Sequence, residues 1–235
     1  LSKDPLTHAM TTSYVAMSDR IDFVAELAAG WAKLRQTPPA SKKIGLILAN
    51  YPNRDGRIAN GVGLDTPQSA FDAMQLLGAN GYDVGEMPLD SAALIAALRK
   101  GPTNAGWKGR ALHVGLSLTD YAAAFALLPP EMQQDVTARW GKPQADPMCD
   151  GTNFRLPILT FGNLAIGVQP ARGYNIDPKS TYHAPDLVPP HNYFAFYIWL
   201  RRHWQSDALV HFGKHGNLEW LPGKALSLSV ACYPE

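Results

Sequence analysis

Apolar residues recur every three or four positions over residues 18–36, 66–78 and 90–101, which predicts an amphipathic helix in each range. The second range opens with Thr66-Pro67, where a capping threonine precedes a proline suited to the first helical turn. In the first range, Ser18 or Asp19 is the expected cap, and the repeating apolar positions are Val24, Leu27, Trp31 and Leu34. The first part of the chain is therefore expected to be rich in helix.

Short continuous apolar runs predict strands between the helices. The clearest run is KKIGLILAN, whose apolar part between Lys43 and Asn50 is typical of a strand buried on both faces of a parallel sheet. RALHVGL, over 110–116, is a second candidate, and ALVHF is the last one. In FRLPILTFGNLAIGVQPARG, Pro157 and Gly162 separate two apolar runs, which predicts a hairpin or an edge strand beside a central one.

The second half of the chain also contains helical patterns. DYAAAFALL and PEMQQDVTARW are separated by Pro129-Pro130, and a later helix carries a stripe formed by Tyr193, Phe196, Tyr197, Leu200 and Trp204. We expect one α/β unit over 1–235, and any internal boundary should fall in the loop at 141–151. The alternation of strands and helices predicts a Rossmann-like α/β fold: an open, mostly parallel sheet with flanking helices, whose loops converge at the carboxyl-end rim.

Composition and charge narrow the function. With 46% hydrophobic residues the chain can bury a core, and its net charge of +1 does not favour nucleic-acid binding. No apolar run approaches the roughly 20 residues of a membrane-spanning helix. Cys149 and Cys232 form no CxxC pair, which fits a reducing cytoplasm. The sequence begins without Met and stops at ACYPE, so we expect a piece of a longer protein.

The stretch HFGKHGNLEWLPGK follows the last predicted strand and concentrates groups that bind metals or carry protons. If the chain becomes helical at Gly216, His215 and Glu219 stand four residues apart on one face, close enough to share a metal ion or a proton. The alternative is a glycine turn with a solvated lysine and histidine, in which the glutamate caps the helix. Spacing alone leaves both open.

Two more polar loops follow predicted strands. NYPNRDGRIANGVGLDTP offers Arg54, Asp55 and Arg57, either for an anionic ligand or as charge pairs of a surface loop. QPARGYNIDPKSTYHAPDLVPPHNY adds Arg172 and His183 among its polar residues. A dinucleotide site is disfavoured because the third glycine of GxGxxG would fall on a threonine, and neither GxxxxGK[ST] nor GxSxG occurs.

These three stretches, in this order, closely resemble the large subunits of aerobic cobaltochelatase, within the broader CobN and magnesium-chelatase H-subunit family. The resemblance covers the chain from Ile44 to about Ser229 and implies an interior fragment of a much longer subunit. Cobalt-type members carry KHGNLEW where magnesium-type members tend to carry THGSLEF, so Lys214, Asn217 and Trp220 resemble the cobalt type.

The resemblance implies a metal–nitrogen ligase that inserts Co(II), as substrate metal, into the corrinoid hydrogenobyrinic acid a,c-diamide during cobalamin biosynthesis. ATP and Mg would be bound by an AAA+ ATPase subunit and its associated subunit, and the excised piece alone would be inactive. We assign Glu219 and His215 as base and metal-handling pair, with His211 and His183 as further metal ligands. The expected substrate-binding residues are Arg54, Asp55, Arg57, Arg172 and Lys214.

Two alternatives remain. The piece could be a non-catalytic scaffold or docking part of the same subunit, or a magnesium-type relative that binds a porphyrin.

Overall fold

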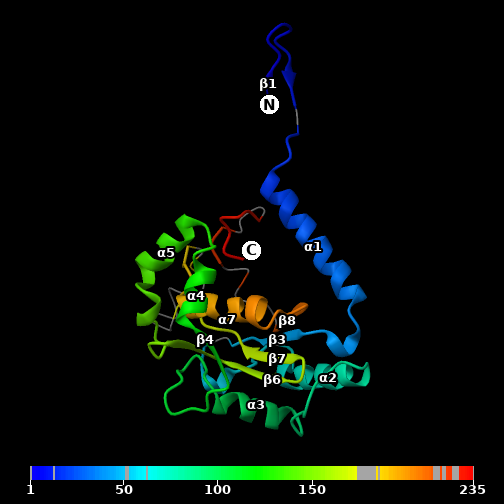
Figure 1. Ribbon diagram of the computed structural model, residues 1–235, viewed down its shortest axis with the longest axis vertical. Coiled ribbons are helices and arrows are strands. Elements are labelled where there is room, and N and C mark those ends of the chain that lie inside the picture. The colour runs from blue at the N-terminus through cyan, green and yellow to red at the C-terminus, as the bar shows by residue number, and fades with distance from the viewer. Residues whose placement is uncertain are drawn as a thin grey trace.

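The computed structural model describes residues 2–12, 14–50, 53–61, 63–173, 184, 186–213, 218, 221–223 and 228–234. At its centre is a four-stranded sheet in the order β6-β7-β3-β8 (Figure 1). β3 pairs in parallel with both β7 and β8, and β6 runs antiparallel to β7. The strands are β3 (Ile44–Leu48), β6 (Ile158–Phe161), β7 (Leu164–Val168) and β8 (Ala208–Phe212). The prediction of a mostly parallel α/β sheet is confirmed.

β3 is one of the two inner strands, and each of its five residues is apolar or glycine and buried. The predicted strand in KKIGLILAN is therefore confirmed, with both faces covered. β6 and β7 form the hairpin that Pro157 and Gly162 predicted, with Gly162 at the turn in the left-handed region (φ 55°). β7 lies inside the sheet and β6 at its edge.

Helices cover both faces of the sheet (Figure 1). α2 (Thr66–Ala79) and α3 (Ser91–Lys100) bury Met74 and Leu94 against Leu46 and Ile166. On the other face, Phe196 of α7 (His191–Ile198) and Tyr121 of α4 (Leu118–Phe125) belong to one core cluster with Ile47. The chain thus leaves β3 toward one face and β7 toward the other, which creates a topological switch point at the carboxyl ends of these two strands.

The helix starts differ slightly from the sequence prediction. Thr66 is the first residue of α2, and the cap is Asp65, whose carboxylate accepts a hydrogen bond from the Gln68 N–H. α1 (Ser18–Gln36) begins at Ser18, and Met17 at the cap position provides no side-chain hydrogen bond, so the predicted Ser18 or Asp19 cap is wrong. Asp65 caps α2 because its carboxylate reaches a backbone N–H of the first turn that has no partner within the helix.

The remaining elements lie around this core. β4 (Val114–Ser117) and β5 (Asn153–Leu156) pair in a separate antiparallel sheet, so the strand predicted over 110–116 exists but starts later. The short strands β1 (Ser2–Lys3) and β2 (Met10–Thr11) pair antiparallel in an N-terminal hairpin. The other elements are α5 (Pro130–Trp140) and the 3-10 turns at Pro39–Ser41, Asp55–Arg57 and Pro143–Ala145. The part of the chain that the structure describes holds no helix long and apolar enough to cross a membrane.

α1 is formed as predicted, but it stands away from the sheet (Figure 1). None of its residues is buried, and Val24, Leu27 and Trp31 are 60%, 52% and 66% exposed. Its C-terminal end is held by an ion pair of 2.8 Å between Lys33 and Asp207, just before β8. The apolar stripe that predicted this helix thus makes little contact with the rest of the described chain.

Candidate functional site at the carboxyl-end rim

The carboxyl ends of β3, β7 and β8 lie at one edge of the sheet, because the three strands are parallel neighbours. Each of the three polar loops of interest leaves one of these strands. The rim is closed by backbone contacts beyond the strands: the Ala49 N–H donates to the Phe212 carbonyl and the Gln169 N–H to the Leu48 carbonyl, both at 2.9 Å. The expected convergence of the loop starts is therefore observed.

Asn104, from the loop after α3, lies at the switch point and contacts the residues that follow β3 and β7. Its Nδ2 donates to the Gln169 carbonyl at 3.0 Å, and its Oδ1 accepts from the Ala171 N–H at 2.8 Å. The buried Asn50 meets the same amide: in the orientation that satisfies its neighbours, its oxygen lies 2.8 Å from Asn104 Nδ2. The same Asn50 amide donates to the Arg54 and Arg57 carbonyls at 3.2 Å. A chain of amides thus joins the loops after β3 and β7.

Arg54, Asp55 and Arg57 lie on this first loop. Both arginine side chains are exposed, whereas the Asp55 carboxylate points inward and accepts from Thr103 Oγ1 and from Arg110 Nη2, each at 2.6 Å. Burial by itself would raise the pKa of Asp55, but the hydrogen bonds from Thr103 and Arg110 outweigh it, so the pKa is lowered. Asp55 therefore anchors the turn that presents the two arginines.

Arg172 follows β7 and is buried, at 5% exposure. Its Nη2 donates to the Ala184 carbonyl at 2.9 Å. Burial lowers the pKa of the guanidinium, and the neighbouring Tyr193 opposes that shift. Because an arginine remains charged in a protein, this loop holds a positive charge inside the molecule.

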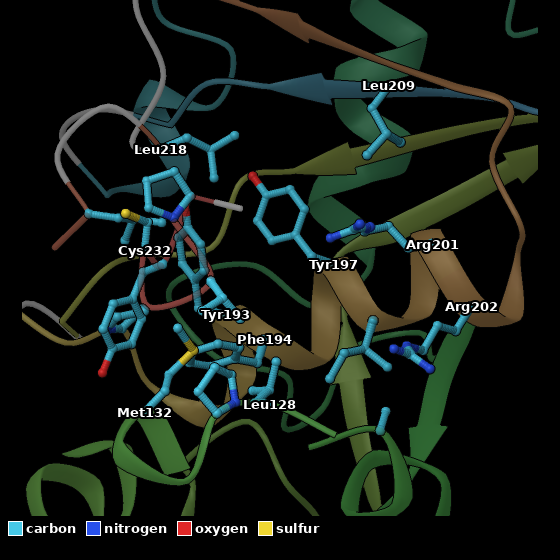
Figure 2. A pocket seen from close by; sticks show the side chains of 18 of the residues that line it. Leu128, Met132, Tyr193, Phe194, Tyr197, Arg201, Arg202, Leu209, Leu218 and Cys232 are labelled. Carbon is cyan, nitrogen blue, oxygen red and sulfur yellow. The ribbon is translucent and has the colours of Figure 1, made fainter. Parts of the chain in front are cut away.

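His211, on β8, faces a cavity of about 710 Å³ (Figure 2), which we call the aromatic cavity. Its imidazole is stacked on the Tyr197 ring, with centroids 6.2 Å apart and planes inclined by 14°. Burial lowers the pKa of His211, which keeps the imidazole neutral near pH 7. The described residues that line the cavity are Ala124, Leu128, Pro129, Met132, Pro189, Tyr193, Phe194, Tyr197, Ile198, Arg201, Arg202, Leu209, His211, Leu218, Leu221, Val230, Cys232, Tyr233 and Pro234.

The wall of the cavity is tied to the rim through Gln169. The Gln169 Nε2 donates to the Tyr197 hydroxyl at 3.1 Å and to the Tyr193 hydroxyl at 3.4 Å. Burial raises the pKa of both tyrosines, so both hydroxyls stay protonated. The residue directly after β7 therefore orients two rings of the cavity.

Four of the proposed site residues, His183, Lys214, His215 and Glu219, lie outside the described residues, as does Gly216, where a helical start was considered. Among the residues that are described, no group of three or more histidine, cysteine, aspartate or glutamate side chains is placed to hold a metal ion. Of the proposed metal ligands, only His211 can therefore be located.

Sequence reasoning missed several residues that shape this region. Asn104 lies in none of the quoted stretches, Asn50 and Gln169 begin two of them without being chosen as site residues, and the tyrosines of α7 stand out in the sequence only as parts of an apolar stripe. A usable signal was present, since buried tyrosine hydroxyls need hydrogen-bond partners and two of them in one stripe indicate a polar contact nearby.

Comparisons with known proteins agree with this architecture. The chain is 50% identical over 232 residues to the aerobic cobaltochelatase subunit CobN of Sinorhizobium sp, which covers 99% of this chain and 18% of that protein. It is 30% identical to the magnesium-chelatase H-subunit of Rhodobacter capsulatus, over 92% of this chain and 18% of that one. The chain thus spans about 18% of the length of these relatives.

The fold also matches a solved structure, the catalytic subunit of cobaltochelatase from Mycobacterium tuberculosis. The TM-score is 0.81 at 41% identity, and the match covers 94% of this chain and 19% of that chain. The family model described as CobN/Magnesium Chelatase matches residues 2–235. On these grounds, the chain belongs to the CobN/magnesium chelatase family.

Proposed function

We propose that this chain is the tetrapyrrole-binding and metal-insertion segment of an ATP-dependent cobaltochelatase, which inserts Co(II) into hydrogenobyrinic acid a,c-diamide. The observation that carries this proposal is the 50% identity to a cobaltochelatase subunit across nearly the whole chain. The lower identity of 30% to a magnesium-chelatase subunit favours cobalt over magnesium as the substrate metal.

Insertion requires a base for the ring N–H protons, ligands for the metal as it loses water, and cations for the carboxylates of the macrocycle. We assign Glu219 and His215 to the first two tasks, with His183 and His211 as further metal ligands. A neutral imidazole such as that of His211 suits a borderline divalent ion.

We assign the carboxylates of the substrate to a set of cations near the rim: Arg54, Arg57, Arg172 and Lys214. The exposed position of Arg54 and Arg57 supports this role, since their guanidinium groups are accessible to a ligand. Asp55 serves substrate binding indirectly, because its bonds to Thr103 and Arg110 hold the turn between the two arginines.

ATP would be hydrolysed by a separate AAA+ subunit with its associated subunit, in the cytoplasm. The lack of a GxxxxGK[ST] motif in the sequence supports this division of labour. A scaffold role is the second candidate, and the exposed apolar stripe of α1 favours it for that part of the chain, since exposed apolar stripes commonly mark contacts with other protein surfaces.

The test uses the intact subunit together with its partner subunits. We expect Glu219→Gln and His215→Ala to abolish cobalt insertion without changing the circular dichroism spectrum or the melting temperature, whereas His8→Ala in the N-terminal hairpin should insert cobalt at the normal rate. Full activity in both site variants would refute the assignment. If substitution of the four cations assigned to the substrate carboxylates, Arg54, Arg57, Arg172 and Lys214, left tetrapyrrole binding unchanged, the scaffold role would be favoured.

A further inference from the structure

We propose that the aromatic cavity is the seat of the tetrapyrrole, with Tyr193, Phe194 and Tyr197 against the face of the ring and Arg201 and Arg202 on its carboxylates. This inference rests on the proposed function, which supplies the class of ligand. It adds a place for the ring and two binding residues that lie outside the three polar loops.

The size and the walls of the cavity suit a flat organic ligand. Its volume of about 710 Å³ falls in the range of roughly 300–1,000 Å³ found for small-molecule sites. Figure 2 shows Tyr197, Arg201 and Leu209 on one side of the hollow, and Leu218 and Cys232 on the other. Such walls can bury the apolar faces of a ring.

Hydrogen bonds and ring contacts within the protein position the aromatic wall. Tyr193 and Tyr197 lie with centroids 5.3 Å apart, and the Gln169 amide holds both hydroxyls. His211 backs Tyr197 from β8. Because Gln169 directly follows β7, a ring resting on these tyrosines would lie near the carboxyl end of that strand.

The charge of the lining favours an anion. Among the described residues that line the cavity there are two arginines and neither an aspartate nor a glutamate. A guanidinium binds a carboxylate through two parallel hydrogen bonds, which a tetrapyrrole with carboxylate side chains can offer at its edge.

The backbone at the two arginines is itself unusual. α7 ends at Ile198, and residues Trp199–His203 form a π-helical turn, closed by the Trp204 N–H donating to the Trp199 carbonyl at 2.8 Å. A π turn inserts an extra residue into a helix, is seldom stable without a reason, and is frequent at functional sites. Here it carries Arg201 and Arg202, which both line the cavity.

The experiment measures binding of metal-free hydrogenobyrinic acid a,c-diamide to the intact subunit by quenching of tryptophan fluorescence, beside cobalt insertion. For Arg201→Gln/Arg202→Gln we expect Kd and KM to rise about tenfold or more, since charge-assisted hydrogen bonds are lost, while kcat changes little. With the methyl ester of the same ligand, wild type and variant should bind equally. Arg139→Gln on α5, outside the cavity, is the matched control.

A second variant tests the cavity by volume. Val230 lines the cavity and is 55% exposed, so Val230→Trp should fill the space with little effect on folding and weaken binding of acid and ester alike. Leu112→Trp, at a similarly exposed apolar site elsewhere, should bind normally.

The outcomes separate the two proposals. If the arginine variant and Val230→Trp bind with wild-type Kd in a subunit that inserts cobalt, the cavity inference is overturned and the proposed function stands. If the wild-type subunit neither binds the tetrapyrrole nor inserts cobalt, the proposed function falls and this inference falls with it.

Discussion

The side-chain oxygen of Asn104 accepts a hydrogen bond from the backbone N–H of Ala171 at 2.8 Å, which ties the loop after α3 to the loop after β7. The amide nitrogen of the same residue reaches the Gln169 carbonyl and the amide of Asn50. One side chain therefore satisfies polar groups from the ends of two neighbouring strands. The arrangement of the rim depends on it, although it belongs to neither strand.

Asn104→Ala should consequently destabilise the fold by about 1–3 kcal/mol, because it leaves polar groups at the rim without partners. Urea denaturation followed by circular dichroism measures this loss. Asn80→Ala is the control, since its exposed amide makes one local bond to the Leu76 carbonyl at 2.8 Å, and its effect should stay within about 0.5 kcal/mol. Equal effects of the two substitutions would show that Asn104 has no special structural role.

Asp55→Asn should lower the free energy of unfolding by about 1 kcal/mol near neutral pH, since the paired carboxylate is only partly buried. The pKa of Asp55 is lowered in the folded protein, so its contribution is present above the ordinary value of 3.8 and is lost as pH falls through the folded pKa. The difference in unfolding free energy between wild type and variant should therefore shrink below about pH 4. A difference that grows on acidification would contradict the ion pair as its source.

His191 should make the stability of the fold depend on pH in a higher pH range than Asp55 does. It is fully buried at the start of α7, and its Nε2 lies 2.9 Å from the Gly141 carbonyl. Since a carbonyl only accepts, Nε2 carries the hydrogen, and Nδ1 accepts from the Tyr121 hydroxyl at 2.7 Å. Burial lowers the pKa of His191 below 6.5, although the Gly141 carbonyl and the nearby Asp146 oppose this.

Because the unfolded chain binds a proton that the folded chain resists, stability should be full above about pH 6.5 and fall as the solution is acidified toward the folded pKa. Urea denaturation at several pH values measures this slope. His191→Gln should be less stable near neutral pH yet show a flatter slope in this range. His8→Gln, in the exposed N-terminal hairpin, should keep the wild-type slope, and a His191→Gln slope as steep as wild type would be evidence against this account.

Alanine substitutions at two glycines, Gly167 and Gly30, should change the stability of the fold in opposite directions. A Cβ at Gly167 on β7 would lie 2.6 Å from Phe196 Cζ, so Gly167→Ala must push α7 away from the sheet and should cost about 1–3 kcal/mol. At Gly30 in α1 nothing lies within 4 Å, and Gly30→Ala should stabilise the helix by about 0.5–1 kcal/mol. Thermal denaturation distinguishes the two signs, and a tolerated alanine at Gly167 would mean that α7 is not held closely against β7.

The elements that the sequence predicts well are those whose burial pattern is local. The run Ile44–Leu48 has no polar residue, which predicts a strand buried on both faces, and Pro157 and Gly162 separate the apolar runs from which the β6-β7 hairpin forms. α1 is equally well predicted as a helix, because spacing determines its form. Whether the apolar stripe of α1 is buried depends on what packs against it, and the spacing of apolar residues within the helix carries no information on that.

The candidate site is less predictable because it is built from contacts between distant segments. Arg54 and Arg172 could be chosen from loops that follow strands, but Asn104 joins those loops from a third segment with no motif of its own. In the sequence, Arg201 and Arg202 indicate only favourable charges at a helix end. Their place on a π turn beside a cavity depends on one extra backbone residue, which side-chain periodicity does not reveal.

Among the described strands, β8 is held by β3 alone, through a single parallel ladder in which Ile47 faces His211 across the register. The position of the His211 imidazole beside Tyr197 therefore depends on β3, which contributes no side chain to the described lining of the cavity. A one-residue slip between β3 and β8 would turn His211 to the opposite side of the sheet and bring a neighbouring apolar residue in its place. The fit of this wall is thus a property of strand alignment as much as of the residues that form its surface.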